Sequence, residues 1–168
     1  MYYTNSDVKT AVDAWFNTNI TGENANKVAS GNYFCEQPKV VPDTSYFAES
    51  KVFTKDNYTP NFNCITDGSE YGVVSGKVGL ITIDEVLYAG GLFDNNFNFY
   101  LNNNYSFWTM SSAGFSESNN STVWSINGVG NIDNIGTGIS NGARPVINLN
   151  ENVTVTGTGT ETDPYIVK

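Results

Sequence analysis

"GARPVINL", residues 142–149, contains the only arginine of this 168-residue chain, which otherwise carries seven lysines. Arg144 stands at the start of an apolar segment that we expect to form a strand. A planar guanidinium that is always charged is tolerated at such a place only with carboxylate or carbonyl partners. We therefore predict that Arg144 is largely buried and bonded to Glu85 or Asp84, or to carbonyl groups of residues 108–112.

A second segment, "GLITIDEVLYAGG" (residues 79–91), predicts a short capped helix over about 82–90. The spacing Thr82-x-x-Glu85 is that of a capping box, in which each residue bonds the backbone amide of the other. Asp84 adds a favourable negative charge to the first turn. Adjacent helix positions point about 100° apart, so Asp84 and Glu85 do not form a catalytic carboxylate pair. We assign Thr82 and Glu85 a structural role.

The N-terminal segment predicts an amphipathic helix over about 6–18, because its apolar residues recur with a helical period and Asn5 or Ser6 can cap its start. These residues are Val8, Ala11, Val12, Trp15 and Phe16. The region of about 23–70 shows no such period and holds three prolines and both cysteines of the chain. A stretch this long without regular structure needs a covalent cross-link, such as a disulfide, to hold it in place.

The two cysteines, Cys35 and Cys64, are 29 positions apart, which excludes a Cys-x-x-Cys redox or zinc pair. The spacing favours a structural disulfide, which would stabilise the fold by about 3 kcal/mol. Two free, buried thiols are the alternative. A disulfide indicates an oxidising compartment outside the cytoplasm.

After Gly91 the pattern changes to short, strand-like runs separated by loops rich in Asn, Gly and Ser. The runs are YSFWTMSS (105–112), STVWSING (121–128), RPVINL (144–149), NVTVTG (152–157) and PYIVK (164–168). Strands and loops thus fill residues 97–168, with a turn at 157–164. Two helices and a small, twisted antiparallel sheet with long loops predict a single α+β domain over residues 1–168.

The net charge of −9 and a pI near 4.2 argue against nucleic acid and anionic membrane surfaces as partners. The sequence contains no run of 18 or more apolar residues, so we expect no direct membrane insertion. Histidine is absent from the sequence, which excludes Ser-His-Asp and Cys-His catalysis in their usual form. We expect a native export signal or anchor to precede Met1.

Several of these segments together resemble a family of uncharacterised secreted or surface proteins of Gram-positive bacteria. The matching motifs are GLITIDEVLYAGG, YSFWTMSS, GARPVINL and the ending GTGTETDPYIV. The N-terminal SDVKTAVDAWFNTNI and the later Phe34-Cys35 also resemble this family, so the resemblance covers nearly the whole chain. Family members often follow a prepilin-like or lipoprotein N-terminus, which implies a surface location and assembly with pilus or envelope components. The family has no settled activity.

A more distant similarity is to the formylglycine-generating-enzyme version of the C-type-lectin-like fold. In that version a Leu-Pro-Thr-x-x-Glu-Trp helix ends in Ala-x-x-Gly-Gly, and a late Gly-Phe-Arg opens a core strand. Here Ile81 replaces the proline and Ala143 replaces the phenylalanine. Those enzymes use cysteines near the arginine motif or a copper site built on them, whereas this chain has no cysteine after Cys64. The similarity therefore implies the fold and argues against the activity.

Aromatic residues and asparagines lie close together in the sequence between about 97 and 124. Rings that stack on sugar faces, beside amides that pair with hydroxyls, are typical of sugar binding. The candidate ligand-binding residues are Tyr100, Asn102, Asn103, Asn104, Tyr105 and Trp124. The alternative is that Trp108 and Trp124 fill the core of a small sheet, and we assign Trp108 a structural role. Alternation places Phe107 and Trp108 on opposite faces, so one face is expected to be core and the other a candidate binding surface.

Two stretches rich in Asp and Asn offer oxygen ligands for calcium, which needs six to eight of them. The ligands would be Asp94, Asn95 and Asn96 in the first stretch, and Asn131, Asp133 and Asn134 in the second. One carboxylate per stretch is few for calcium, and turn-forming residues are the alternative. We expect no cofactor, with calcium as the alternative.

These patterns favour a non-enzymatic, extracellular or cell-surface module for ligand binding or adhesion, whose partner is a glycan or a protein. One alternative is a structural pilin-like subunit or filament spacer without a ligand. A second is a variable ligand-binding protein diversified by a retroelement, because such systems mutate asparagine codons. The 24 asparagines are not confined to the C-terminal part, where such variation would be expected.

Overall fold

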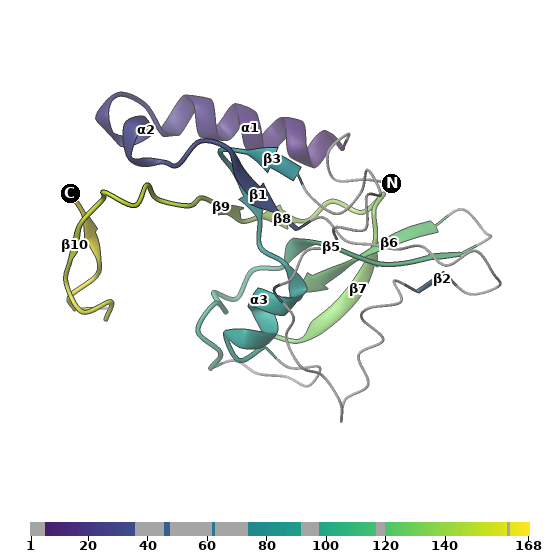
Figure 1. Cartoon of the computed structure of the whole chain (residues 1–168). Coiled ribbons are helices and arrows are strands. Elements are labelled where there is room, and N and C mark those ends of the chain that lie inside the picture. Colours follow the sequence, from purple (N-terminus) through teal and green to yellow (C-terminus); the bar gives the residue numbers. More distant parts are fainter. Residues whose placement is uncertain are drawn as a thin grey trace.

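The computed structural model describes residues 6–35, 46–47, 62, 74–91, 98–116, 120–160 and 162–168. These residues form an α+β arrangement of few helices and small, mainly antiparallel sheets, as predicted (Figure 1). The helices are α1 (Asp7–Asn19), α2 (Glu23–Lys27) and α3 (Ile83–Tyr88). The strands are β1 (Asn32–Phe34), β2 (Tyr46–Phe47), β3 (Val74–Gly76), β4 (Gly79–Leu80), β5 (Phe107–Ser116), β6 (Asn120–Ile126), β7 (Ile132–Gly136), β8 (Gly142–Ala143), β9 (Pro145–Val146), β10 (Val155–Thr156) and β11 (Ile166–Val167). None of the helices in the described part of the chain is long and apolar enough to cross a membrane.

Helix α1 begins after Ser6, whose hydroxyl accepts a hydrogen bond from the Lys9 amide at 3.1 Å. This cap is the start signal that predicted a helix over about 6–18, and the helix is confirmed. Its buried stripe is narrower than predicted, because Val12 and Phe16 are buried whereas Trp15 is 42% exposed. The helix therefore packs through one row of residues spaced four apart.

The region of about 23–70 was predicted to be irregular, and its described parts contain regular structure. Helix α2 follows Gly22, whose φ of +59° is readily adopted only by glycine. Strand β1 pairs antiparallel with β3, with Phe34 opposite Val74, and β2 pairs with β5. Strands of two or three residues show no periodicity, which is why the sequence pattern did not reveal them.

Helix α3 carries the predicted capping box. The Glu85 amide donates to Thr82 Oγ1 at 3.2 Å, and the Thr82 amide donates to Glu85 Oε2 at 2.7 Å. The helix ends at Tyr88, two residues before the predicted end. Gly90 follows with a φ of +93°, so the glycine pair stops the helix as expected.

The largest sheet has the strand order β2-β5-β6-β7, and β8 pairs with β5 in parallel. Strands β5 and β6 place Phe107 opposite Ile126 and Trp108 opposite Ser125. Strand β7 pairs with β6 through residues 132–136. The expectation of a turn at 131–134 is wrong, because cross-strand pairing overrides the turn preference of Asp and Asn there.

The segment 142–149 contacts three parts of the molecule in succession. Strand β8 pairs with β5, β9 pairs antiparallel with β4, and Leu149 forms a bridge with Val28. A Cβ atom at Gly142 would lie 2.6 Å from the Ser106 carbonyl oxygen, so only glycine fits this close approach. The segment thereby joins the central sheet to β4 and to the end of α2.

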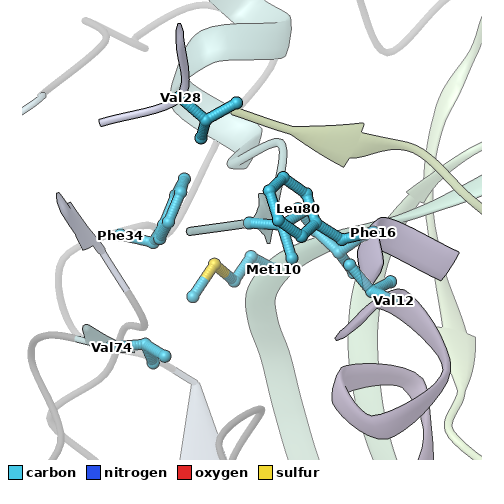
Figure 2. Packing of buried hydrophobic residues seen from close by; sticks show 8 residues of the cluster. Val12, Phe16, Val28, Phe34, Val74, Leu80 and Met110 are labelled. Atoms are coloured by element: carbon cyan, nitrogen blue, oxygen red, sulfur yellow. The ribbon is translucent and has the colours of Figure 1, made fainter. Parts of the chain in front are cut away.

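Two hydrophobic clusters form the core. The first lies beneath α1 and consists of Val12, Phe16, Val28, Phe34, Val74, Val78, Leu80 and Met110 (Figure 2). The second lies beside α3 and consists of Ile81, Ile83, Val86, Leu87, Phe99, Phe107, Ile126 and Ile132. Val146 of β9 packs against both clusters. The Ile83 amide donates to the buried Ser111 Oγ at 3.0 Å, which ties α3 to β5.

Strands β10 and β11 form a hairpin at the C-terminal end of the described chain, apart from the central sheet (Figure 1). The predicted turn at 157–164 is confirmed, and the Asp163 carboxylate accepts from the Thr158 amide at 2.9 Å. Several apolar side chains of this hairpin are exposed, namely Val155, Tyr165, Ile166 and Val167. The hairpin therefore adds little to the core.

Candidate functional site

Arg144 lies between β8 and β9 and is half-buried, so the prediction that it is largely buried is wrong. Its Nη1 donates a hydrogen bond to the Leu101 carbonyl, and its guanidinium carbon lies 4.0 Å from the centre of the Phe107 ring. Desolvation by burial lowers the pKa of Arg144 from its ordinary value. Arg144 therefore links the loop before β5, through Leu101, to the face of β5, through Phe107.

The prediction of a carboxylate partner for Arg144 is wrong. Among the described residues no ion pair involves Arg144, and the single one found joins Lys9 to Asp13. Glu85 is directed to its own helix cap, where Oε2 accepts from both the amide and the hydroxyl of Thr82. The carbonyl partner that was expected within 108–112 is instead that of Leu101.

The predicted ligand-binding loop is exposed but uses its amide groups internally. Tyr100 and Tyr105 are 81% and 75% exposed. Asn102 Oδ1 accepts from the Asn104 amide at 3.0 Å, and Asn103 Oδ1 accepts from the Tyr105 amide at 3.3 Å. Asn104 has a φ of +63°, a conformation that asparagine tolerates better than most residues. These side-chain oxygens shape the turn, so the two exposed rings are the part of the loop that is open to a ligand.

Trp124 of β6 lies on the α3 side of the sheet. It is half-buried and packs against the second cluster, as does Leu101 from the loop. Its carbonyl accepts a hydrogen bond from Thr109 Oγ1 at 2.8 Å. A role for Trp124 in ligand binding stays a prediction.

A different region of the described chain forms a concave site. A cleft of about 430 Å³ lies between the first turn of α1 and the face of β5, and we name it the α1–β5 cleft. Its walls include Asp7 and Val8 of α1, Trp108 and Met110 of β5, and Ser140 and Asn141 of the segment before β8. This volume is within the range of about 300–1,000 Å³ that is typical of small-molecule sites.

Two side chains of the α1–β5 cleft carry buried donors without a hydrogen-bond partner in the described part of the chain. They are Trp108 Nε1 and Asn141 Nδ2. The Asn141 oxygen is held by the Gly142 amide at 2.9 Å, so the orientation of this amide group is set by the backbone. A buried donor left unsatisfied costs about 1–3 kcal/mol, which an acceptor brought by a ligand would offset.

Trp108 was expected to be structural, and it belongs to neither core cluster. It is half-buried and lines the α1–β5 cleft. The alternation in residues 105–110 separated it from Phe107, but it did not tell which of the two faces is the core. Asn141 had no such signal, because its place in the cleft depends on the packing of α1 (Asp7–Asn19), which lies far earlier in the chain.

The calcium prediction concerns residues of which only some are described. Asp133 is exposed on β7, and its Oδ1 accepts from the Asn134 amide at 2.8 Å. Successive strand residues point to opposite faces, which separates Asp133 from Asn134 as ligands. Within the described ranges no group of three or more His, Cys, Asp or Glu side chains could hold a metal. Asp94, Asn95 and Asn96 lie outside these ranges.

Cys35 is disulfide-bonded. Cys64, the only other cysteine of the sequence, lies outside the described residues. The predicted disulfide is thus confirmed at Cys35, and the alternative of two free thiols is wrong.

No protein-family model, curated protein or solved structure matches the chain. The resemblance to a Gram-positive surface family therefore stays a prediction.

Proposed function

We propose that this domain is a non-enzymatic ligand-binding or adhesion module that works outside the cytoplasm, at a bacterial cell surface. The observation that carries the proposal is the α1–β5 cleft, which combines an apolar floor with two unsatisfied donors, Trp108 Nε1 and Asn141 Nδ2. A concave, largely apolar site with a few polar groups is the usual form of a ligand pocket.

The proposed location rests on the disulfide at Cys35. Structural disulfides persist in oxidising compartments and are rare in the cytosol. A surface partner, either a glycan or a protein, is consistent with the strongly acidic chain, whose net charge is −9.

The proposed non-enzymatic character rests on the sequence. The chain contains no histidine, the residue that most often transfers protons near neutral pH. The two carboxylates of α3 have other roles, since Asp84 is buried and Glu85 closes the capping box.

We further propose that the fold is C-type-lectin-like, of the formylglycine-generating-enzyme version. Two features support this proposal: a capped helix, α3, packed against the central sheet, and a late arginine segment that pairs with β5. Folds of this kind serve many functions, so the fold by itself does not determine what the domain binds.

A combined screen tests the proposed function. The domain is applied to a glycan array and to a library of surface proteins and peptides, and its ability to turn over any bound compound is measured. We expect a ligand from one of the two panels and no turnover. Silence across both panels would contradict the proposal, and turnover of a bound compound would show an enzyme instead.

A second candidate function is that of a structural, pilin-like subunit that assembles with pilus or envelope components. The observation in its favour is the exposed apolar surface of the β10–β11 hairpin, which includes Tyr165 and Ile166 at 63% and 56% exposure. Exposed apolar patches of this kind often mark contacts between proteins. Replacement of Ile166 by Lys would abolish assembly in this case, and it would leave binding in the α1–β5 cleft intact.

A further inference from the structure

We propose that the α1–β5 cleft takes a neutral saccharide, held by Trp108 and Asn141. This inference rests on the proposed ligand-binding function and adds the chemical class of the ligand. It places the site on the face of the sheet opposite to the loop of Tyr100 and Tyr105.

The floor of the cleft suits the apolar face of a sugar ring. Leu80, Met110 and Val8 contribute aliphatic surface, and Trp108 contributes the only aromatic ring among the described lining residues. The C–H groups of one face of a pyranose pack on such a surface, as they do on aromatic rings. A ring that enters the cleft would therefore bury apolar area without losing hydroxyl hydrogen bonds at its edge.

The donors of the cleft require acceptors. Trp108 Nε1 can only donate, and Asn141 Nδ2 donates as well. Because the Asn141 oxygen is bonded to the Gly142 amide at 2.9 Å, the end of this side chain that lacks a partner is the donor Nδ2. Sugar hydroxyl and ring oxygens are acceptors of the kind that both nitrogens lack.

The rim of the cleft offers acceptors in return. Asp7 is exposed in the first turn of α1, and the hydroxyl groups of Ser140 and Thr137 line the wall formed by the segment after β7. A ligand that meets donors on one side and acceptors on the other must itself both donate and accept. A polyhydroxylated ring meets this condition, whereas an aliphatic or aromatic side chain of a protein partner does not.

The charge of the cleft selects against anionic sugars. No lysine or arginine is found among the described residues that line it, and Asp7 carries a negative charge. The net charge of the whole chain, −9, acts in the same direction. Neutral saccharides are therefore favoured over uronic and sialic acids.

Calorimetric titration with a panel of neutral disaccharides, and with acidic oligosaccharides for comparison, tests the inference. We expect at least one neutral disaccharide to bind, and acidic ones to bind at least about tenfold more weakly. Replacement of Trp108 by Phe keeps the ring and removes the donor, and we expect a loss of about tenfold in affinity, equivalent to about 1.4 kcal/mol. Trp15→Phe is the matched control, because Trp15 is exposed on α1 and is not part of the cleft.

A second variant keeps the test decisive should Trp108→Phe be poorly folded. Asn141→Asp retains the oxygen that accepts from the Gly142 amide and removes the donor, so we again expect a loss of at least tenfold. Full saccharide affinity in both folded variants would overturn the inference. Binding of a peptide or protein alone would overturn it and leave the proposed function standing, whereas the absence of any ligand would refute both.

Discussion

The two faces of the β5–β6–β7 sheet have opposite characters, although their residues alternate along the same strands. On one face Phe107 and Ile126 are 2% and 0% exposed and pack with α3 into the second cluster. On the other face Trp108 and Val123 line the α1–β5 cleft. We call the face of Phe107 and Ile126 the closed face, and the face of Trp108 and Val123 the open face. Neighbouring residues of β5 thus point to different faces.

The difference arises from where each helix is anchored. The start of α3 is fixed to the sheet by the hydrogen bond from the Ile83 amide to Ser111 Oγ, and its aliphatic residues Ile83, Val86 and Leu87 are buried. Helix α1 is anchored through Val12 and Phe16, which lie beyond its first turn. The polar first turn of α1, with Ser6 and Asp7, lines the α1–β5 cleft and does not fill it. A helix anchored away from one end leaves a cleft at that end.

The largest effect is expected from truncation on the closed face. Phe107→Ala should lower the free energy of unfolding by about 3–5 kcal/mol, because it removes a buried ring and the surface on which Arg144 stacks. Urea denaturation followed by circular dichroism measures the change. Tyr105→Ala, at a position that is 75% exposed, should stay within about 0.5 kcal/mol of the parent protein. Similar losses in the two variants would contradict the assignment of the closed face.

The next effect concerns the link between the closed face and the loop before β5. Arg144→Ala should cost about 2 kcal/mol, because it removes a charged hydrogen bond to the Leu101 carbonyl and the stacking on Phe107. Arg144→Lys should recover part of this loss, since an ammonium group keeps the charge but not the planar fork. The urea midpoints of the two variants provide the measurement, and an unchanged midpoint for Arg144→Ala would refute the role.

A smaller effect is expected at the helix that covers the closed face. Thr82→Ala should cost about 1 kcal/mol, because the Glu85 amide loses its acceptor at the start of α3. Thermal unfolding compares this variant with Thr154→Ala, at an exposed position near β10. Equal stability of the two variants would mean that the capping box contributes nothing measurable.

The smallest effect on stability is expected on the open face. Trp108→Phe should change the free energy of unfolding by less than about 1 kcal/mol, because the ring is only half-buried and its Nε1 has no partner to lose. Denaturant unfolding of Trp108→Phe and of Phe107→Ala compares the loss of stability on the two faces. A larger loss for Trp108→Phe would place Trp108 in the core after all.

Local signals in the sequence were enough to predict the parts of the fold that are stabilised locally. The Ser6 cap and the Thr82–Glu85 capping box act within one helical turn, and both helices form where these signals stand. Alternation in β5 likewise separated Phe107 from Trp108. These features depend on residues at most four positions apart.

Features that depend on distant partners were missed or misassigned. Arg144 bonds the carbonyl of Leu101, 43 positions away, and no local pattern distinguishes that carbonyl from one in 108–112. Strand β7 forms from Asx-rich residues because β6 pairs with it along its whole length. Asp7 and Asn141 line the same α1–β5 cleft, which only the packing of α1 could determine.

The three tryptophans, Trp15, Trp108 and Trp124, give the most direct test of the contrast between the two faces. Their indole N–H resonances are assigned by single Trp→Phe substitutions and followed by NMR while a neutral disaccharide is added. We predict that the Trp108 signal shifts with saturation and that the signals of Trp15 and Trp124 stay in place. A saturating shift of Trp124 with an unmoved Trp108 would contradict the account, because the ligand would then lie on the α3 face.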